Sequence, residues 1–281
     1  MLRFVDVTKS YGSIRAVDGL SFSVSAGEVF GLLGPNGAGK TTTVSLAVGL
    51  LKPDSGQILL EGISNADGER NKAHLGLAPQ TLALYEGLSG EENVVFFGKL
   101  AGLRGKELRD QVAWALDFVG LTARRKDRVR TYSGGMKRRL NLAIAVVHRP
   151  PILLLDEPTV GVDPQSRNAI FENIETLAHE GHAILYTTHY MEEAERLCHR
   201  VGILDRGRLL ALDTVPNLVR AYGEKPVLVV EDLHGEKRLA CDDPVAELVK
   251  LQGTGRYRRF RIEQPTLESV FLNLTGRQLR D

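Results

Sequence analysis

The chain has 281 residues, of which 43% are hydrophobic and 25% are charged, and its formal net charge is +1. These values are typical of a soluble globular protein with one large domain and a small one, or two modest ones. They indicate no polyanionic partner. The two cysteines, Cys198 and Cys241, are far apart and give no evidence for a disulfide or a zinc site. No apolar run approaches the about 18 residues of a membrane span, and we expect no signal peptide, so a partner must supply any spanning part.

Residues 1–30 alternate apolar and polar side chains between turn signals, which predicts short antiparallel strands. Tyr11 lies between them, in an expected loop beside Gly12. An aromatic residue there can be a local packing residue, or its flat ring can stack on a nucleotide base. The residues alone leave both interpretations open.

A glycine-rich segment from Gly34 to Thr41 has the pattern G-x-x-x-x-G-K-T of a phosphate-binding loop. An apolar run, Val29–Leu33, predicts a buried strand before it, and the apolar stretch Val44–Leu51 predicts a helix after it. Backbone N–H groups and the helix dipole then face an anion. A dinucleotide fingerprint fits less well, because it has no use for a lysine and a hydroxyl here. The candidate binding residues are Gly34, Pro35, Asn36, Gly37, Ala38, Gly39, Lys40, Thr41 and Thr42.

The middle of the chain predicts two more strands and then a helical region. Gln57–Glu61 follows a turn, and Leu75–Gln80 is a short strand that Pro79 should end. Apolar residues recur at helical spacing within residues 88–148.

Eight basic residues lie within residues 124–139 of this helical region. A solvated face is the favoured interpretation, with a nucleic-acid patch or contact with anionic lipid as alternatives. Within the same stretch, Ser133 is placed to cap a helix, and Gly134 and Gly135 leave bare N–H groups at its start. A lone Ser-Gly-Gly is common in plain loops. The basic residues are Arg124, Arg125, Lys126, Arg128, Arg130, Lys137, Arg138 and Arg139.

Two strands of the predicted parallel sheet end in residues that carry chemistry. Ile152–Leu155 is an apolar run typical of a strand buried on both faces, and Asp156 and Glu157 follow it. Ligands of open α/β sheets bind at this edge, where Asp156 suits Mg²⁺ and Glu157 suits orienting or deprotonating an attacking water. Residues 183–188 form another apolar strand that ends at His189, so a γ-phosphate contact is plausible there.

These pieces follow one order along the chain. They are an aromatic loop residue, the phosphate-binding loop, Gln80, Ser-Gly-Gly, the strand ending in Asp156 and Glu157, Asp163 and His189. Over residues 2–220 this order and spacing resemble the nucleotide-binding subunit of an ATP-binding cassette (ABC) transporter. The residue identities within three stretches, 132–140, 161–164 and 265–271, are similar to those of the daunorubicin-resistance type of export ATPase subunit.

The resemblance implies an α/β P-loop NTPase cassette at residues 1–222. It would have a mainly parallel core sheet, an antiparallel β subdomain and a helical subdomain at about residues 85–148. After about residue 222 the residue pattern changes, and two strands, a helix, a further strand and a last helix capped by Thr266 predict a small α+β appendix at 223–281.

The resemblance also implies roles for single residues, with ATP and Mg²⁺ as cofactors. Tyr11 would stack on adenine, and residues 34–42 would hold the phosphates. The catalytic residues would be Glu157, His189, Gln80 and Lys40, and the Mg²⁺ ligands Thr41, Gln80 and Asp156. Ser133, Gly134 and Gly135 would contact ATP bound to a second subunit, with Asp163 across the interface.

Two departures from the family pattern are visible. Met136 stands where glutamine is usual, and Gly161 and Val162 replace the usual Ala-Leu pair before Asp163. Neither departure affects the expected catalytic residues, so hydrolysis is still expected.

We therefore expect an ATPase subunit of an exporter at the cytoplasmic face of the membrane. It would form a head-to-tail dimer and drive a separate multi-span membrane subunit, with no direct nucleic-acid partner. The cargo would be a drug, lipid or polysaccharide-like compound. An import ATPase, or a soluble cassette that acts on ribosomes or nucleic acid, is the alternative.

Overall fold

The computed structural model describes residues 1–61, 63–64, 72–232, 235–252 and 257–276. The chain divides into two compact units, Met1–Leu212 and Asp213–Asp281. This division precedes the position near residue 222 that the sequence suggests, because the helix α7 (Val215–Tyr222) packs with α9 (Leu267–Thr275) in the second unit. The sequence also predicts a turn at His234 and Gly235 between the first two strands of the tail, and His234 lies outside the described residues.

The first unit is built around a six-stranded sheet with the order β10-β9-β3-β8-β7-β6. The strands β3, β6, β7, β8 and β9 pair in parallel. Their carboxyl ends therefore meet at one edge. The strands are β3 Val29–Leu33, β6 Leu75–Ala78, β7 Ile152–Asp156, β8 Ala183–Thr188, β9 Arg200–Asp205 and β10 Arg208–Asp213.

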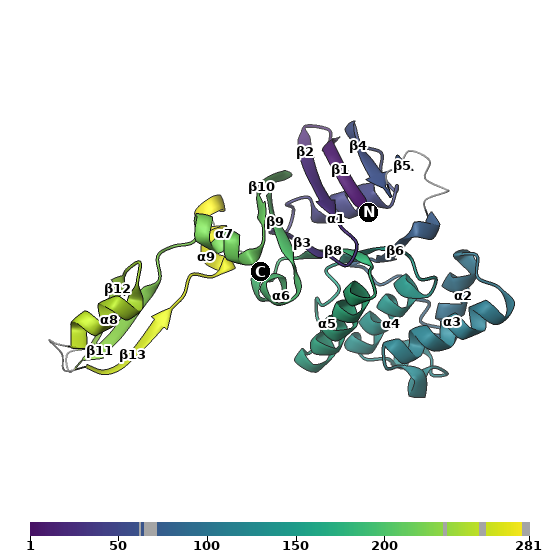
Figure 1. The fold of residues 1–281 in the computed structure, drawn as a ribbon. Helices are drawn as coiled ribbons and strands as arrows, with labels where there is room; N and C mark the ends of the chain where they lie inside the picture. The colour runs from purple at the N-terminus through teal and green to yellow at the C-terminus, as the bar shows by residue number, and fades with distance from the viewer. Residues whose placement is uncertain (62, 65–71, 233–234, 253–256, 277–281) are drawn as a thin grey trace. The chain divides into compact units, whose positions relative to one another are not determined.

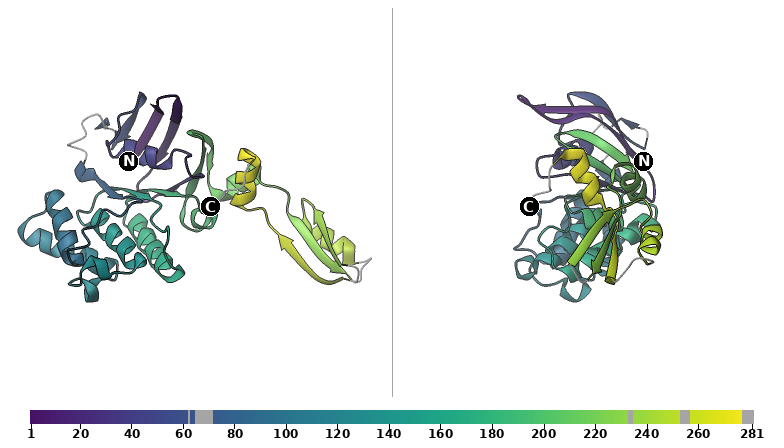
Figure 2. Two further views of the ribbon diagram at one scale, coloured as in Figure 1. Left: turned by 180° about the vertical axis from the view of Figure 1, so that it is seen from behind. Right: turned by 90° about the vertical axis from the view of Figure 1, so that its left-hand side faces the viewer.

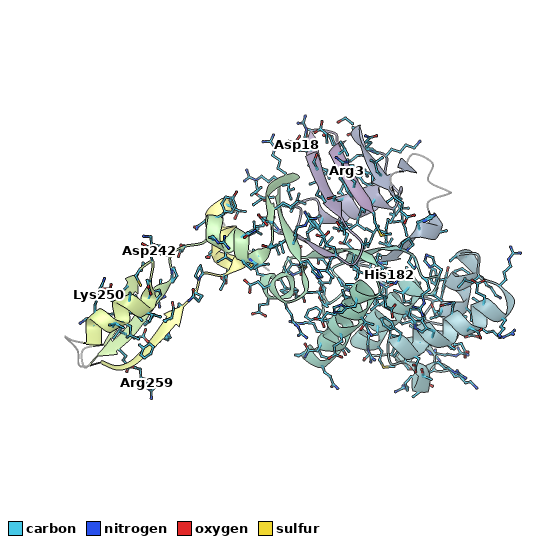
Figure 3. All side chains as sticks on the ribbon, viewed as in Figure 1. Arg3, Asp18, His182, Asp242, Lys250 and Arg259 are labelled. Carbon is cyan, nitrogen blue, oxygen red and sulfur yellow. The ribbon has the colours of Figure 1, made fainter. Side chains whose placement is uncertain are left out.

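A second, antiparallel sheet has the order β2-β1-β4-β5. Its strands alternate buried and exposed residues, as expected of a sheet with one solvated face. Charged side chains such as Arg3 and Asp18 lie on this sheet in Figure 3. The strands are β1 Leu2–Tyr11, β2 Ile14–Val24, β4 Ser55–Leu60 and β5 Ile63–Ser64.

The strand β7 divides two hydrophobic cores. Ile152 and Leu154 pack with the antiparallel sheet and the helix α1 (Lys40–Ala47), whereas Leu153 and Leu155 pack with the helices on the other face. Figures 1 and 2 show these layers: α1 lies between the two sheets, and α2 to α5 cover the opposite face of the six-stranded sheet. A strand buried on both faces reads as a continuous apolar run, which is why β7 was recognisable.

The helical region holds three α-helices and two short 3₁₀ turns. α2 begins with a capping box in which Ser89 and Glu92 exchange hydrogen bonds. The helices are α2 Gly90–Leu100, α3 Gly105–Phe118 and α4 Gly134–Val146, with turns at Thr122–Arg124 and Val129–Thr131; α5 Pro164–His179 and α6 Met191–Leu197 follow later.

The second unit holds a three-stranded antiparallel sheet with the order β12-β11-β13. Val229 on the central strand is buried, and ion pairs Arg238–Glu263 and Arg261–Glu236 join the two outer strands on the same face. The elements are β11 Val227–Asp232, β12 Gly235–Ala240, α8 Pro244–Gln252 and β13 Tyr257–Glu263. Figure 3 labels Asp242, Lys250 and Arg259 among the polar side chains of this unit.

Candidate active site

The loop between β3 and α1 holds Lys40 in a buried position. Gly39 precedes the helix with φ 111°, and a Cβ on it would lie 2.3 Å from the carbonyl oxygen of Ala16, so only glycine fits. The Lys40 ammonium donates to the carbonyl oxygens of Gly34 at 2.7 Å and Pro35 at 3.2 Å. The helix α1 ends at Ala47 and not at Leu51 as predicted, and Gly49 turns the chain with φ 73°.

Three side chains from distant parts of the sequence converge on the carboxylate of Glu157. Lys40 Nζ lies 3.0 Å from its Oε1, and Gln80 Nε2 donates to its Oε2 at 3.0 Å. His189 Nδ1 lies 3.3 Å from Oε1. These residues follow β3, β6, β7 and β8, whose carboxyl ends the parallel pairing brings to one edge.

The charge state of Glu157 depends on its neighbours. Burial alone would raise its pKa, because it disfavours the carboxylate. The charge and hydrogen bond of Lys40, followed by those of His189, outweigh burial and hold the pKa of Glu157 below its ordinary value. Glu157 is therefore ionised at neutral pH.

Asp156 has the opposite environment. Its carboxyl is buried, which raises its pKa, although hydrogen bonds from Thr187 and Thr41 act against that rise. The Thr187 hydroxyl donates to Oδ1 of Asp156 at 2.6 Å. Thr41 and Asp156 thus place two hard oxygen donors together at the start of α1, and oxygen donors are the ligands that Mg²⁺ prefers.

The backbone of Glu157 is strained. Its φ is 47°, in a left-handed region that non-glycine residues rarely adopt. In this conformation its N–H donates to the Thr187 carbonyl at 3.2 Å and to the Thr187 hydroxyl at 3.0 Å. Strain of about 1–3 kcal/mol at such a residue persists only where the surroundings enforce it, as they often do in active sites.

Residues of the Ser-Gly-Gly segment lie beside Asp163. Ser133 caps α4, as predicted, by accepting from the Met136 N–H at 3.2 Å. Asp163 caps α5 by accepting from the Ser166 N–H at 2.9 Å. A Cβ on Gly135 would lie 2.2 Å from Ser166 Oγ, so close packing requires glycine there. Within the described part of the chain, no hydrogen bond or ion pair joins these residues to Lys40 or Glu157.

The remaining predicted residues differ in exposure. Asn36, Gly37 and Thr41 are exposed, whereas Ala38 is buried. Tyr11 is 48% exposed. It is the last residue of β1 and pairs with Ile14, so the expected loop position was wrong: the strand extends through Tyr11, and the turn begins after it.

The two sequence departures have apolar roles in the fold. Met136 packs against the core that α4 shares with the sheet, and Val162 is buried in the same core.

The structure adds residues that the sequence reasoning missed. Thr187 forms hydrogen bonds with both Asp156 and Glu157. Its position in the sequence Thr187-Thr188-His189, at the end of a buried strand, could have indicated this role. Arg138, counted only as part of a basic stretch, donates to the Gln80 carbonyl at 2.6 Å. Burial lowers the pKa of Arg138, and the charges of Glu157 and Asp156 oppose that change. The contact with Gln80 places Arg138 next to the site.

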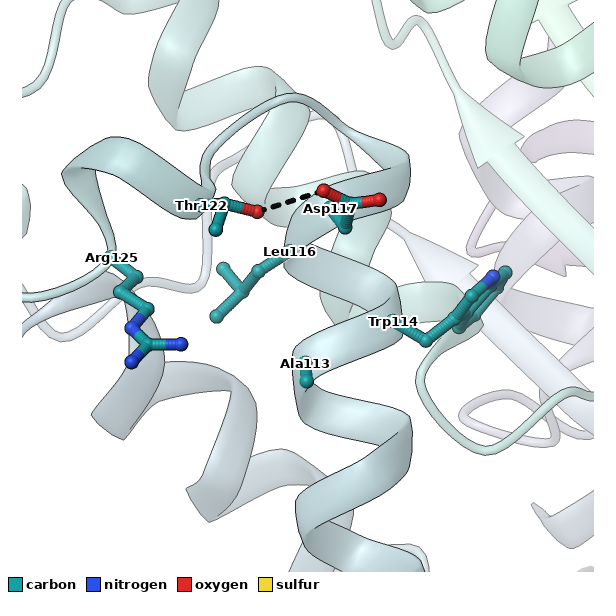
Figure 4. A pocket seen from close by; sticks show the side chains of 6 residues that line it. All are labelled: Ala113, Trp114, Leu116, Asp117, Thr122 and Arg125. Carbon is teal, nitrogen blue, oxygen red and sulfur yellow. Dashed lines mark hydrogen bonds between the residues drawn. The ribbon is translucent and has the colours of Figure 1, made fainter.

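A separate hollow of about 350 Å³ lies on the helical region and contains none of the predicted site residues. In Figure 4 the side chain of Trp114 extends from one side of α3, and Arg125, which follows the turn Thr122–Arg124, lies across from the other side. Its lining residues are Ala113, Trp114, Leu116, Asp117, Thr122 and Arg125.

The strand β3, the glycine-rich loop and the helix α1 bury Lys40 beside the carboxylates that follow β7. This arrangement defines a P-loop NTPase. Sequence comparison narrows this class. Residues 17–160 match the family model described as ABC transporter. The chain is 41% identical to the linearmycin resistance ATP-binding protein of Bacillus subtilis, with all of both chains covered. It is also 41% identical to the Nod factor export ATP-binding protein I of Paraburkholderia xenovorans, covering 100% of this chain and 98% of that one.

Solved structures agree with these relatives. An ATP-binding subunit of an ABC transporter matches with a TM-score of 0.72 and 32% identity, covering 79% of this chain and 93% of that one. A dimeric post-hydrolysis cassette bound to ADP and phosphate matches with a TM-score of 0.69 and 25% identity, covering 76% and 98%. The chain belongs to the ATP-binding cassette transporter family. It is an ATP-binding ATPase cassette of that family.

Among the described residues, no helix is long and apolar enough to cross a membrane.

Proposed function

We propose that this chain is the ATP-hydrolysing subunit of an exporter and works with a separate membrane subunit on its cytoplasmic side. The observation that carries the proposal is the convergence of Lys40, Gln80 and His189 on the Glu157 carboxylate beside the phosphate-binding loop. The names of the two relatives, one for linearmycin resistance and one for Nod factor export, support export over import.

The site has cationic and donor groups that a phosphate can use. His189 Nδ1 is buried, and its contact with Glu157 Oε1 is long, at 3.3 Å. Lys40 neutralises Glu157, and a phosphate bound in the loop competes for its charge. As Lys40 turns to phosphate, it lowers the pKa of Glu157 less, and the rise from that lowered value makes the carboxylate a stronger base for the attacking water.

We assign Mg²⁺ binding to Thr41, Gln80 and Asp156, whose oxygen atoms suit this ion. When bound, Mg²⁺ neutralises charge on the phosphates. Thr187 keeps Asp156 in place, and Gln80 keeps its contact with Glu157, so the chain's own hydrogen bonds hold both carboxylates ready. Tyr11, exposed at the end of β1, is assigned to stack on adenine.

The assembly proposed is a head-to-tail pair of cassettes. Ser133, Gly134 and Gly135 at the start of α4 would contact the γ-phosphate of ATP bound by the partner, and Asp163 would lie across the interface. Hydrogen bonds to a charged group contribute about 1.5–3 kcal/mol each, so a few at each site would decide closure. The dimeric relative bound to ADP and phosphate supports this arrangement.

The test is Glu157→Gln in the full chain. The amide keeps the size of the side chain but cannot act as a base, so we expect hydrolysis to fall about 10²–10⁴-fold while ATP still binds. With ATP and Mg²⁺ the variant should accumulate as a dimer in light scattering.

Glu172→Gln is the matched control, because Glu172 is an exposed glutamate of α5 outside the site. It should hydrolyse ATP at the unchanged rate. A Glu157→Gln protein that remains monomeric with saturating ATP and turns over normally would overturn the assignment.

A further inference from the structure

A second buried carboxylate lies behind the active site. Glu193, on α6, is 2% exposed, and the proposed reaction gives it no role. An ionised carboxylate in such a position is costly unless hydrogen bonds or opposite charges compensate it. Its contacts therefore carry information about why it is there.

Three hydroxyl groups donate to this carboxylate. Thr159 Oγ1 donates to Oε1 at 2.7 Å. Tyr186 and Thr188 both donate to Oε2 at 2.8 Å. All three donors are buried. Burial, followed by the Glu193 charge, raises the pKa of Tyr186 well above its ordinary value, so its hydroxyl remains a donor.

These donors come from the two segments that hold the catalytic candidates. Thr159 is two residues after Glu157, in the loop that leads to Asp163. Thr188 directly precedes His189, and its hydroxyl also accepts from the Tyr190 N–H at 2.9 Å. One carboxylate thus links the loop after β7 to the end of β8, directly before His189.

A third element contacts the same group. Arg167 of α5 has its Nε 3.9 Å from Glu193 Oε1, and among the described residues this nitrogen has no hydrogen-bond partner. The helix α5 begins at its cap Asp163. Through Thr159 and Arg167 the Glu193 carboxylate therefore contacts both the loop that leads to Asp163 and the helix that follows it.

We infer that Glu193 is a positioning residue for ATP hydrolysis. By holding Thr159 and Thr188 together it fixes Glu157 and His189 relative to each other and ties both to the loop that ends at Asp163. This inference rests on the proposed function, because it assigns Glu157 and His189 their roles there. Glu193 touches none of the groups assigned to phosphate or Mg²⁺, so it acts through its neighbours.

The experiment compares Glu193→Ala with Glu192→Gln, an exposed glutamate of the same helix. Hydrogen exchange of the full chain is first measured without nucleotide. In Glu193→Ala, amide exchange should rise about tenfold in both segments, 157–163 and 187–193, since three hydrogen bonds are lost. Turnover should fall about 10–100-fold, because misplacement of reacting groups is costly. The ATP dissociation constant should stay within about twofold, because Lys40 and its loop are unchanged. Glu192→Gln should change none of these.

A pair of variants separates positioning from general stability. Thr159→Val removes one donor and should lower turnover, whereas Thr159→Ser keeps the hydroxyl and should restore it. Thr159→Val and Tyr186→Phe each remove one hydroxyl, together with its contacts to Glu193 and to the other hydroxyl. With Thr159→Ser as their comparison, they decide the question if Glu193→Ala does not fold.

Unchanged exchange in either segment, full turnover by Glu193→Ala, or equal impairment of Thr159→Ser and Thr159→Val overturns the inference. A parallel loss of ATP affinity in Glu193→Ala does so as well, since it indicates a structural role. If the unmodified chain hydrolyses no ATP, the proposed function fails. The exchange measurement needs no nucleotide and still decides whether Glu193 links the two segments.

Discussion

At the scale of single residues, Lys40 and Glu157 determine each other's state. The Lys40 ammonium is 5% exposed and 3.0 Å from the Glu157 carboxylate, so each compensates the buried charge of the other. Under the proposed function, phosphate would take the place of the Glu157 carboxylate as the partner of Lys40. The strained φ of Glu157 is a further sign that the fold imposes this position.

Lys40→Met tests this coupling through the pH dependence of stability. The pKa of Glu157 is lower in the folded chain than in the unfolded chain, where it is about 4.3. The ion pair therefore stabilises the fold fully above about pH 4.3, and this stabilisation is lost as the pH falls through the folded pKa. Without Lys40, burial raises that pKa instead. We expect a loss of about 1–3 kcal/mol at pH 7 that shrinks as the pH approaches 4, measured by denaturant unfolding.

Lys99→Met is the control, since Lys99 is exposed on α2. It should show no such pH trend. A Lys40→Met deficit that stays constant from pH 7 to pH 4 would contradict the assigned ion pair.

At the scale of elements, α4 is tied to the segment after β6 by three side chains. Asn141 donates to the Pro79 carbonyl at 3.1 Å, and Arg138 donates to the Gln80 carbonyl at 2.6 Å. Lys137 pairs with Glu86 at 2.5 Å. The helix that begins at Ser133 therefore holds the backbone of Gln80. Some residues of the basic stretch therefore form contacts within the fold. Arg139 does so as well, by donating to the Val119 carbonyl.

Arg138→Ala should loosen Gln80 from Glu157. We expect turnover to fall about tenfold, as misplaced catalytic groups are costly, while ATP affinity stays within about twofold because the phosphate-binding loop is unchanged. Steady-state kinetics and a fluorescent nucleotide titration measure the two quantities.

Arg130→Ala removes an exposed arginine of the same stretch and should have no effect on either quantity. Equal loss of activity in both variants would show that the total charge matters and the contact with Gln80 does not.

The elements also show how far sequence patterns reach. The bounds of β3 and β8 agree with the predicted apolar runs, since strands buried on both faces are continuous in hydrophobicity. The end of α1 was misplaced because Val48 and Leu51 pack against the core from outside the helix. Apolar character marks burial and does not by itself give the conformation.

At the scale of the whole molecule, the proposed function requires a partner. Purification of the full chain from detergent-solubilised native membranes, followed by mass spectrometry, should recover a multi-span membrane protein without a solute-binding protein. The relatives named for resistance and export give this expectation. The control is the same purification without tagged chain.

A solute-binding protein in that complex would change the assignment to import. Ribosomal proteins or nucleic acid, with no membrane protein, would contradict the transport function and leave the ATPase assignment intact.

The sequence by itself determined the class of this protein. The loop from Gly34 to Thr41, the carboxylates Asp156 and Glu157, and His189 are local patterns whose residue types the phosphate chemistry requires. Only the tertiary structure decided which groups contact each charged side chain. Lys40 pairs with Glu157, Arg138 donates to the Gln80 carbonyl, and Glu193 accepts from three hydroxyls. The contacts of Lys40 with Glu157, Arg138 with Gln80 and Glu193 with Thr159 join residues tens of positions apart. The pairing of parallel strands, which no local pattern encodes, brings their segments together.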